Sequence, residues 1–236
     1  ALPALLVALF RLDHQAHFSG LVLAFAGCLA LRWLLSSKAL AGLTPAPDLM
    51  ADVTRHGLLP VLVLYWQQWR RSAQPEPVPT LDYSPLPGEI VIVVQCESFA
   101  DPQDLFGALA PPLEGLARAR SKAVQWGNLL VDGFGAYTMR TEYGVLFGRA
   151  AAELGFRRFD PYLTALGDHS HALPARLAAA HWHRVFIHPH DLRFYGRDRV
   201  LGAAGFDRLV GPEAFAEPAG QYVPDAEIAD AIAGEI

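Results

Sequence analysis

The sequence is poor in cysteine and carries no excess of positive charge, and both shortages exclude classes of protein. Cys28 and Cys96 are its only cysteines in 236 residues. Cys28 lies in an apolar segment and Cys96 ends a predicted buried strand, so we expect no disulfide between them and no small secreted domain held by disulfides. The formal net charge of -5 argues against a nucleic-acid-binding protein, which normally carries a basic stripe.

Long apolar runs are concentrated in the first 71 residues. Residues 18–36 come close to the about 20 apolar residues that a membrane-spanning helix needs, and Arg32 near one end can reach lipid headgroups. The shorter run 57–69 ends in residues typical of a membrane interface, Trp66, Trp69, Arg70 and Arg71. We expect residues 1–71 to form hydrophobic membrane-anchor helices. The alternative is a pair of buried helices in a soluble domain.

Residues 72–87 contain five prolines and no apolar periodicity, which predicts a stiff, extended linker. Residues 88–236 have a different character and form the predicted catalytic domain. The run 89–96 is rich in β-branched residues and is typical of a strand buried on both faces of a parallel sheet. Further strands are predicted at 123–131 and 184–188.

Helical patterns alternate with these strands. They cover residues 112–121, 138–147, 173–180 and 195–204, and Gly205 is expected to cap the last one. Alternating strands and helices predict an α/β fold with an open, mainly parallel sheet flanked by helices.

Three polar residues follow the predicted strands, where the sites of open parallel sheets lie. Glu97 comes after the first strand, Thr138 after the second and His188 at the end of the third. A carboxylate leaving a buried strand needs a partner. For Glu97 this partner is a divalent cation, an arginine or a capped helix.

Thr138 lies where the glycine-bearing loop 132–137 meets a helix, and two interpretations are compatible there. As an N-cap it would be completed by Thr141 or Glu142. As a nucleophile it would benefit from the helix N-terminus, which stabilises a phosphate, and from a metal ion that favours its ionised form.

Six histidines form three His-x-His pairs: His169 and His171, His181 and His183, and His188 and His190. Such pairs can bind zinc when they lie on one face of a strand. The first two pairs lie in a loop and at a turn, so we interpret those four histidines as surface or helix-capping residues.

Three segments resemble one enzyme family in order and separation. They are VIVVQCESFADP (91–102), GAYTMRTEYGVLFG (135–148) and FIHPHDLRFYGRDRVLGAAGFDRLV (186–210). All three are similar to motifs of the lipoteichoic acid synthase group, the phosphoglycerol transferase branch of the alkaline phosphatase/sulfatase superfamily. The resemblance covers about residues 90–231 and implies an alkaline-phosphatase-like sheet.

The resemblance also implies roles for individual residues. Glu97 matches a metal-binding glutamate, and Thr138 matches the metal-bound nucleophile that becomes phosphorylated. His188 and Arg197 match residues that hold the phosphate of the substrate, with Tyr195 as the aromatic residue beside them. The implied cofactor is a divalent metal ion, Mn²⁺ or Mg²⁺, with Zn²⁺ as a further option.

The implied function is transfer of a phosphoglycerol or related phospho group from a phosphatidylglycerol-like membrane lipid to a glycan or glycolipid, in cell envelope biogenesis. The catalytic domain would lie on the outer, periplasmic face of a bacterial inner membrane, with the lipid bilayer as a partner and no nucleic acid. The alternatives are a sulfuric-ester or phosphodiester hydrolase of the same superfamily, or a non-catalytic membrane-anchored protein that binds lipid or glycan.

Two features bear on these alternatives. No Cys/Ser-x-Pro-x-Arg motif of arylsulfatases occurs near Thr138, and the cysteine-poor domain is unlike disulfide-rich phosphoethanolamine transferases. The family's Asp-His metal pair is missing downstream, and Asp168-His169 lies too early to replace it. We therefore expect a truncated catalytic domain that holds metal poorly and has little activity alone.

Overall fold

The computed structural model describes residues 14–35, 37–96, 99–131, 137–177, 181–216 and 222–236. The chain divides into two compact units, Ala1–Ala73 and Gln74–Ile236. Each unit is described by itself. The predicted domain boundary at residue 88 lies within the second unit.

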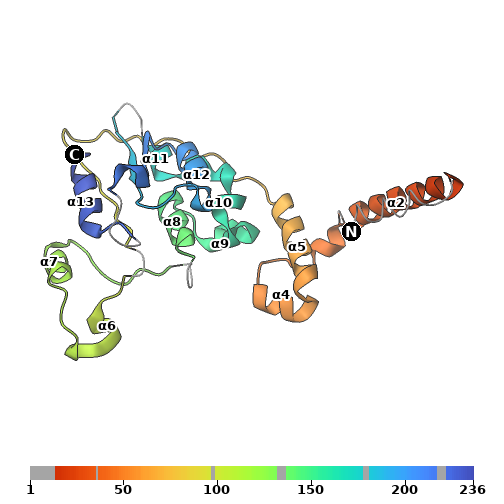
Figure 1. Ribbon diagram of the computed structural model, residues 1–236, viewed down its shortest axis with the longest axis horizontal. Coiled ribbons are helices and arrows are strands. Elements are labelled where there is room, and N and C mark those ends of the chain that lie inside the picture. Colours follow the sequence, from red (N-terminus) through yellow and green to blue (C-terminus); the bar gives the residue numbers. More distant parts are fainter. Residues whose placement is uncertain (1–13, 36, 97–98, 132–136, 178–180, 217–221) are drawn as a thin grey trace. The chain divides into compact units, whose positions relative to one another are not determined.

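The first unit contains helices and connecting loops in its described part (Figure 1). Its helices are α2 (His14–Leu35), α3 (Lys38–Ala41), α4 (Leu49–His56) and α5 (Leu58–Arg71). The Asp48 side chain caps α4 by accepting a hydrogen bond from the backbone of Ala51. Gly57, with φ at 81°, separates α4 from α5, and the Tyr65 hydroxyl donates to Asp52 Oδ2 at 2.6 Å.

Residues 18–36 were predicted to span a membrane. Helix α2 covers nearly all of that run. Among the residues described, however, no helix combines the length and the apolar character that crossing a membrane requires.

The second unit contains short helices and a small sheet. Its elements before the sheet are α6 (Pro102–Phe106), η1 (Gly107–Leu109), α7 (Glu114–Lys122), α8 (Thr138–Phe147), α9 (Ala151–Leu154), η2 (Gly155–Phe159), α10 (Pro161–Thr164), η3 (Leu166–His171) and α11 (Leu173–Arg176). Those from the sheet onward are β1 (Val185–Ile187), η4 (Phe194–Gly196), α12 (Arg197–Ala203), β2 (Arg208–Val210), η5 (Pro212–Ala214) and α13 (Asp225–Ala233).

The sheet has two parallel strands, with Val185 opposite Arg208 and Ile187 opposite Val210. The prediction of an α/β domain with parallel strands is thus confirmed in its coarse form. The helix predicted at 138–147 is α8, the one at 112–121 corresponds to α7, and the strand at 184–188 contains β1. The helix at 173–180 is confirmed as far as Arg176, and residues 178–180 lie outside the described part.

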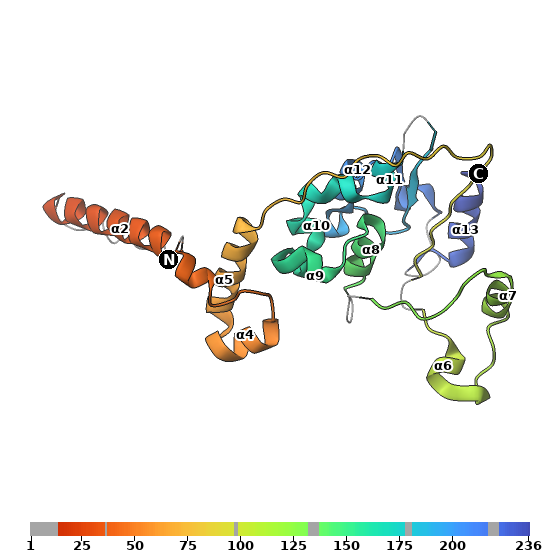
Figure 2. The same cartoon turned by 180° about the vertical axis from the view of Figure 1, so that it is seen from behind.

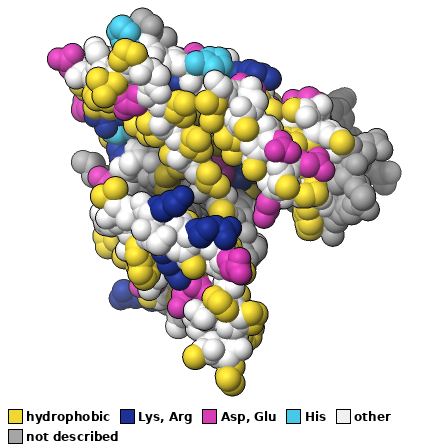
Figure 3. All heavy atoms as spheres, turned by 90° about the vertical axis from the view of Figure 1, so that its left-hand side faces the viewer, with side chains coloured by type: hydrophobic (Ala, Val, Ile, Leu, Met, Phe, Trp, Pro, Cys, Tyr) yellow, Lys and Arg dark blue, Asp and Glu magenta, His cyan; other side chains and the backbone are white. Residues whose placement is uncertain are grey.

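Two strand predictions are wrong. Residues 89–96 and 123–131 are all described, and none of them is in a strand. Their apolar side chains are largely exposed, including those of Val93, Val124 and Leu130. A strand of a parallel sheet needs a neighbouring strand for its backbone groups and cover for its side chains, and most apolar side chains of these described segments are exposed. Figure 3 shows many hydrophobic side chains lying at the surface of the molecule.

The core of the second unit is built on one face of α8. Met139, Tyr143 and Phe147 recur every four residues and are almost fully buried. The rings of Tyr143 and Phe147 stack at 4.1 Å, and the edge of Tyr162 from α10 meets Tyr143 at 5.8 Å. Val200 of α12 joins the same core. Figures 1 and 2 show α8, α10 and α12 packed together.

The proline-rich segment is attached to the second unit. It contains no helix or strand, and it hydrogen-bonds to residues far along the chain. The backbone N–H of Leu81 donates to the carbonyl of Arg176 at 2.7 Å, and that of Val78 donates to Ser170 Oγ at 3.2 Å. An extended backbone forms few hydrogen bonds within itself, and here its N–H groups donate to residues of η3 and α11 instead.

Candidate functional site

Thr138 is the first residue of α8, and its side chain is half-buried. The N-cap position belongs to Tyr137, whose side chain makes no capping hydrogen bond. The expected capping role of Thr138, completed by Thr141 or Glu142, is therefore wrong. The Arg140 N–H donates to the carbonyl of Tyr137, and the N–H groups of Thr138 and Met139, which the Tyr137 side chain does not cap, are suited to an anion that approaches the start of α8.

Glu142 lies one turn after Thr138 and binds Arg197 of α12. Both carboxylate oxygens of Glu142 accept hydrogen bonds from the guanidinium group of Arg197. Arg197 Nη2 donates to Glu142 Oε2 at 2.8 Å, and Nε donates to Oε1 at 3.0 Å and to Oε2 at 3.2 Å. Both side chains are buried. A bidentate, charge-assisted pair of this kind is strong and geometrically specific, so Arg197 is fixed to the helix that carries Thr138.

Tyr162 of α10 adds a third partner to this pair, because its hydroxyl donates to Glu142 Oε1. Burial, followed by the charge of Glu142, raises the pKa of the Tyr162 hydroxyl. Tyr162 is thus held as a neutral donor. Glu142 accepts from two residues while remaining buried, which meets the requirement that a buried charge be paired and hydrogen-bonded.

Tyr195 has a strained backbone two residues before Arg197. With φ at 61°, it is the single non-glycine residue of positive φ within the described ranges. Its ring lies 4.3 Å from that of Phe194 and 5.2 Å from the guanidinium carbon of Arg197. Such strain persists where the surroundings impose it and is frequent in binding sites. The strain places an aromatic ring against the charge of Arg197.

His188 directly follows β1, as predicted. Its backbone N–H donates to the carbonyl of Val210 at 2.9 Å and extends the contact between the strands. Its ring Nδ1 accepts from the backbone N–H of His190 at 3.1 Å, so a neutral ring carries its proton on Nε2. The backbone thereby sets which nitrogen of His188 can donate.

The structure joins some of the predicted residues and adds others. Arg197 and Tyr195 contact each other, and Arg197 is tied to the helix of Thr138 through Glu142. Glu97 lies outside the described residues. Glu142 and Tyr162 were not predicted as members of the site. The signal for Glu142 was a carboxylate beside the buried positions Met139 and Tyr143 of one helix.

The residues described do not by themselves form a metal centre. No group of three or more His, Cys, Asp or Glu side chains among them is arranged to hold a metal ion. Asp168 of the rejected Asp168-His169 pair is fully buried and accepts from Arg157 Nη1 at 2.6 Å. Its charge is therefore already matched by an arginine.

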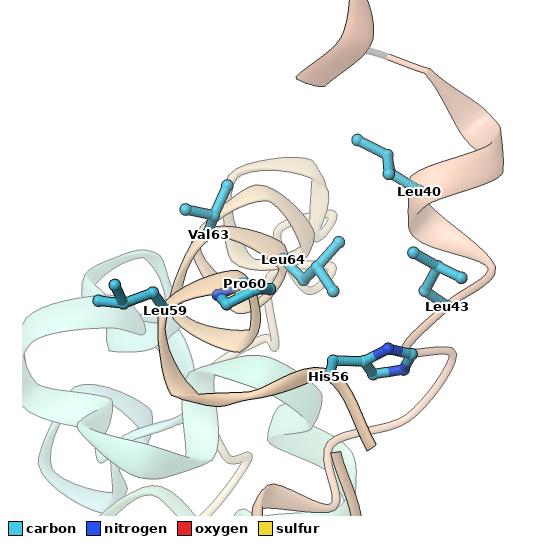
Figure 4. Close-up of a pocket in the computed structure, with 7 residues that line it drawn as sticks. All are labelled: Leu40, Leu43, His56, Leu59, Pro60, Val63 and Leu64. Carbon is cyan, nitrogen blue, oxygen red and sulfur yellow. The ribbon is translucent and has the colours of Figure 1, made fainter. Parts of the chain in front are cut away.

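Two hollows among the described residues are also of note. One, of about 450 Å³, lies in the first unit and has almost entirely apolar walls (Figure 4), formed by Leu40, Leu43, His56, Leu59, Pro60, Val63 and Leu64. The other, of about 180 Å³, lies in the second unit between Phe147, His169 and Val200. Neither is lined by a predicted site residue.

Comparisons with known proteins agree with the alkaline phosphatase/sulfatase superfamily to which the motifs point, while its phosphoglycerol transferase branch stays a prediction. A family model described as Sulfatase matches residues 89–236. The capsular polysaccharide biosynthesis protein RkpI of Rhizobium meliloti (strain 1021) is 37% identical over 150 residues, which cover 62% of this chain and 28% of that relative. The chain thus spans less than a third of the relative's length. No solved structure matches.

Proposed function

The chain belongs to the sulfatase family of enzymes, and we propose that it transfers a phosphoglycerol or related phospho group from a membrane phospholipid to a glycan or glycolipid. The observation that carries this proposal is the position of Thr138. It begins a ten-residue helix whose N-cap residue, Tyr137, makes no side-chain capping hydrogen bond, inside the matched family domain. A hydroxyl there can attack a phosphate that the helix N-terminus stabilises.

The proposed reaction is a double displacement at phosphorus. The Thr138 hydroxyl loses its proton, and its oxygen attacks the phosphorus of the donor phosphodiester. The bond from phosphorus to the diacylglycerol oxygen breaks, and that oxygen takes up a proton. A hydroxyl of the acceptor then attacks the phospho-threonine, and Thr138 is released with its proton restored.

Three further residues are proposed to receive the phosphate. The Nε2 proton of His188 and the guanidinium of Arg197 would face its oxygens, with the ring of Tyr195 beside them. N–H donors fixed before the reaction stabilise the charge that develops on those oxygens. The support is the close contact between Tyr195 and Arg197 and the backbone contact that orients the His188 ring.

Members of this superfamily generally depend on a divalent metal ion. We propose Mn²⁺ or Mg²⁺, or Zn²⁺, held by Glu97 and the Thr138 hydroxyl together with ligands other than the described residues. Bound there, the ion would lower the pKa of the Thr138 hydroxyl.

The phospho donor, the acceptor and the cellular location of the protein are proposed from other observations. The relative's name concerns capsular polysaccharide biosynthesis, which favours a glycan acceptor. Helix α2 exposes large apolar side chains, including those of Phe18, Leu23 and Phe25, and the guanidinium of Arg70 lies over the ring of Trp66 in α5. These features favour a lipid partner. We propose a bacterial inner membrane with the second unit on its outer face.

The test uses the full-length protein that contains this chain, in membranes with a headgroup-labelled phosphatidylglycerol and Mn²⁺. Wild-type protein should release diacylglycerol and carry label on Thr138, found by mass spectrometry of an acid-quenched sample. Thr138→Ala should lose at least about 1,000-fold in turnover because the covalent route is closed. Thr138→Ser keeps a hydroxyl and should retain partial activity. Equal turnover by wild type and Thr138→Ala would overturn the proposal.

A further inference from the structure

We propose that Glu142 is a specificity-determining residue of this site. Its carboxylate cancels the charge of Arg197, and the site therefore favours a phosphodiester, with one negative charge, over a phosphomonoester, with two. This inference rests on the proposed function, because it assumes that the phosphate is attacked by Thr138.

The first support is the completeness of the pairing. Arg197 directs Nε and Nη2 at the two oxygens of Glu142, and Tyr162 donates to the same carboxylate. The exposed fractions of the Arg197 and Glu142 side chains are 3% and 8%. Inside the protein, a pair so shielded from water is screened little by solvent or salt. To an approaching substrate it presents a net charge near zero, not the full charge of an arginine.

The second support is the distance to the nucleophile. Thr138 and Glu142 are four residues apart on α8, so they lie on the same face with Cβ atoms about 5–6 Å apart. Any phosphorus atom attacked by Thr138 must come close to the Glu142–Arg197 pair. The phosphate oxygens would then respond to any change in the net charge of that pair.

The third support is electrostatic. A phosphodiester carries one negative charge, and a phosphomonoester carries close to two above its second pKa of about 6. If Glu142 becomes neutral, the site gains one positive charge, and the more highly charged monoester gains more attraction. At an effective dielectric constant of about 20 and a separation of about 10 Å, one added pair of unit charges changes relative rates by about tenfold.

The experiment compares two chromogenic substrates in the full-length, metal-supplied protein at pH 8. They are bis(p-nitrophenyl) phosphate, a monoanion, and p-nitrophenyl phosphate, a dianion. The measured quantity is the ratio of the two kcat/KM values. Both rates come from the same preparation, so the ratio is independent of the fraction of protein that is folded.

The expected shifts have opposite signs for the two partners of the pair. Glu142→Gln keeps the size and an accepting oxygen but removes the charge, and it should move the diester-to-monoester ratio toward the monoester by about tenfold. Arg197→Gln should move it toward the diester. The double variant restores a neutral pair, so its ratio should return to within about threefold of wild type.

Asp168→Asn is the matched control, since it neutralises another buried carboxylate paired with an arginine in the same unit. It should lower the amount of folded protein but leave the ratio unchanged. An equilibrium measurement adds a readout without turnover: calorimetric titration should show inorganic phosphate binding tighter to Glu142→Gln than to wild type, with dimethyl phosphate little changed.

The outcomes separate this inference from the function on which it rests. Loss of both activities in Thr138→Ala, combined with the same ratio in wild type and Glu142→Gln, would overturn the role of Glu142 and leave the proposed function standing. Wild-type turnover that does not depend on Thr138 would overturn the proposed function itself. Ratio shifts of opposite sign in the two single variants would support both.

Discussion

Arg157 and Asp168 form an ion pair in the interior of the second unit: Arg157 Nη1 lies 2.6 Å from Asp168 Oδ1, and the two side chains are 6% and 0% exposed. The neighbouring Tyr143 hydroxyl donates to the carbonyl of Ala165 at 3.3 Å. Burial, followed by the charge of Asp168, raises the pKa of Tyr143. This pair joins η2 to η3 as the Glu142–Arg197 pair joins α8 to α12.

Removing one partner of this pair should be strongly destabilising. Asp168→Ala leaves Arg157 buried without a counter-charge, and we expect a loss of about 3–5 kcal/mol in the free energy of unfolding. Urea denaturation followed by circular dichroism would measure it. Asp191→Ala provides the contrast, because Asp191 pairs with Arg193 at the surface, and it should cost far less stability. Similar losses for both variants would contradict the assignment.

Asp207 should make the stability of the second unit depend on pH at its acid end. Arg184 donates to Asp207 from its side chain at 2.6 Å and 2.9 Å and from its backbone N–H at 2.9 Å. The side-chain hydrogen bond, and then the backbone one, lower the pKa of Asp207 to about 2 from 3.8. The folded state therefore favours ionised Asp207. Its stabilisation is present above about pH 4 and is lost as the pH falls through about 2.

The corresponding variant is Asp207→Asn, with the unfolding free energy measured in urea at a series of pH values. At neutral pH we expect a loss on the order of 1 kcal/mol, reduced because the Asp207 side chain is 33% exposed. The gap between wild type and variant should close as the pH falls from about 4 to 2. A gap that stayed constant over this range would contradict a contribution from ionised Asp207.

Gly205 is required by both backbone and space. Its φ is +91°, and a Cβ atom there would lie 2.8 Å from Ala175 Cα and 2.9 Å from its nitrogen. Gly205→Ala should therefore lower the unfolding free energy by about 2 kcal/mol or more. A Cβ atom added at Gly202 of α12 would have space, with nothing within 4 Å. Gly202→Ala should therefore raise the unfolding free energy by about 0.5–1 kcal/mol. Thermal unfolding would record the two opposite shifts in Tm, and shifts of the same sign would refute this account.

Removal of metal should abolish turnover by the full-length protein. Treatment with a chelator is expected to reduce release of diacylglycerol by at least about 100-fold, and added Mn²⁺ should restore it. Glu97→Gln should require about 10- to 100-fold more Mn²⁺ for half-maximal activity, because one carboxylate ligand is lost. Turnover of wild type that survives exhaustive chelation would rule out the proposed metal chemistry.

Local patterns predicted helices α7, α8, α11 and α12 of the second unit but missed α6, α9, α10 and α13. Residues 138–147 form α8 with the predicted bounds, because the apolar face formed by Met139, Tyr143 and Phe147 has helical spacing. The strand at 184–188 was also recognised. The apolar runs 89–96 and 123–131 were also predicted as strands, yet neither is a strand. A single helix makes its own hydrogen bonds, whereas a strand exists only with a partner, which a local pattern does not contain.

The sequence by itself therefore determined that Thr138 begins a helix and that His188, Tyr195 and Arg197 lie in a segment typical of the sulfatase family. Only the tertiary structure decided which charges meet. Glu142 and Arg197 are 55 residues apart, and nothing in the spacing of either residue requires the other. The fold buries both side chains next to each other. A buried arginine and a buried carboxylate each need a partner of opposite charge and hydrogen bonds to replace those with water.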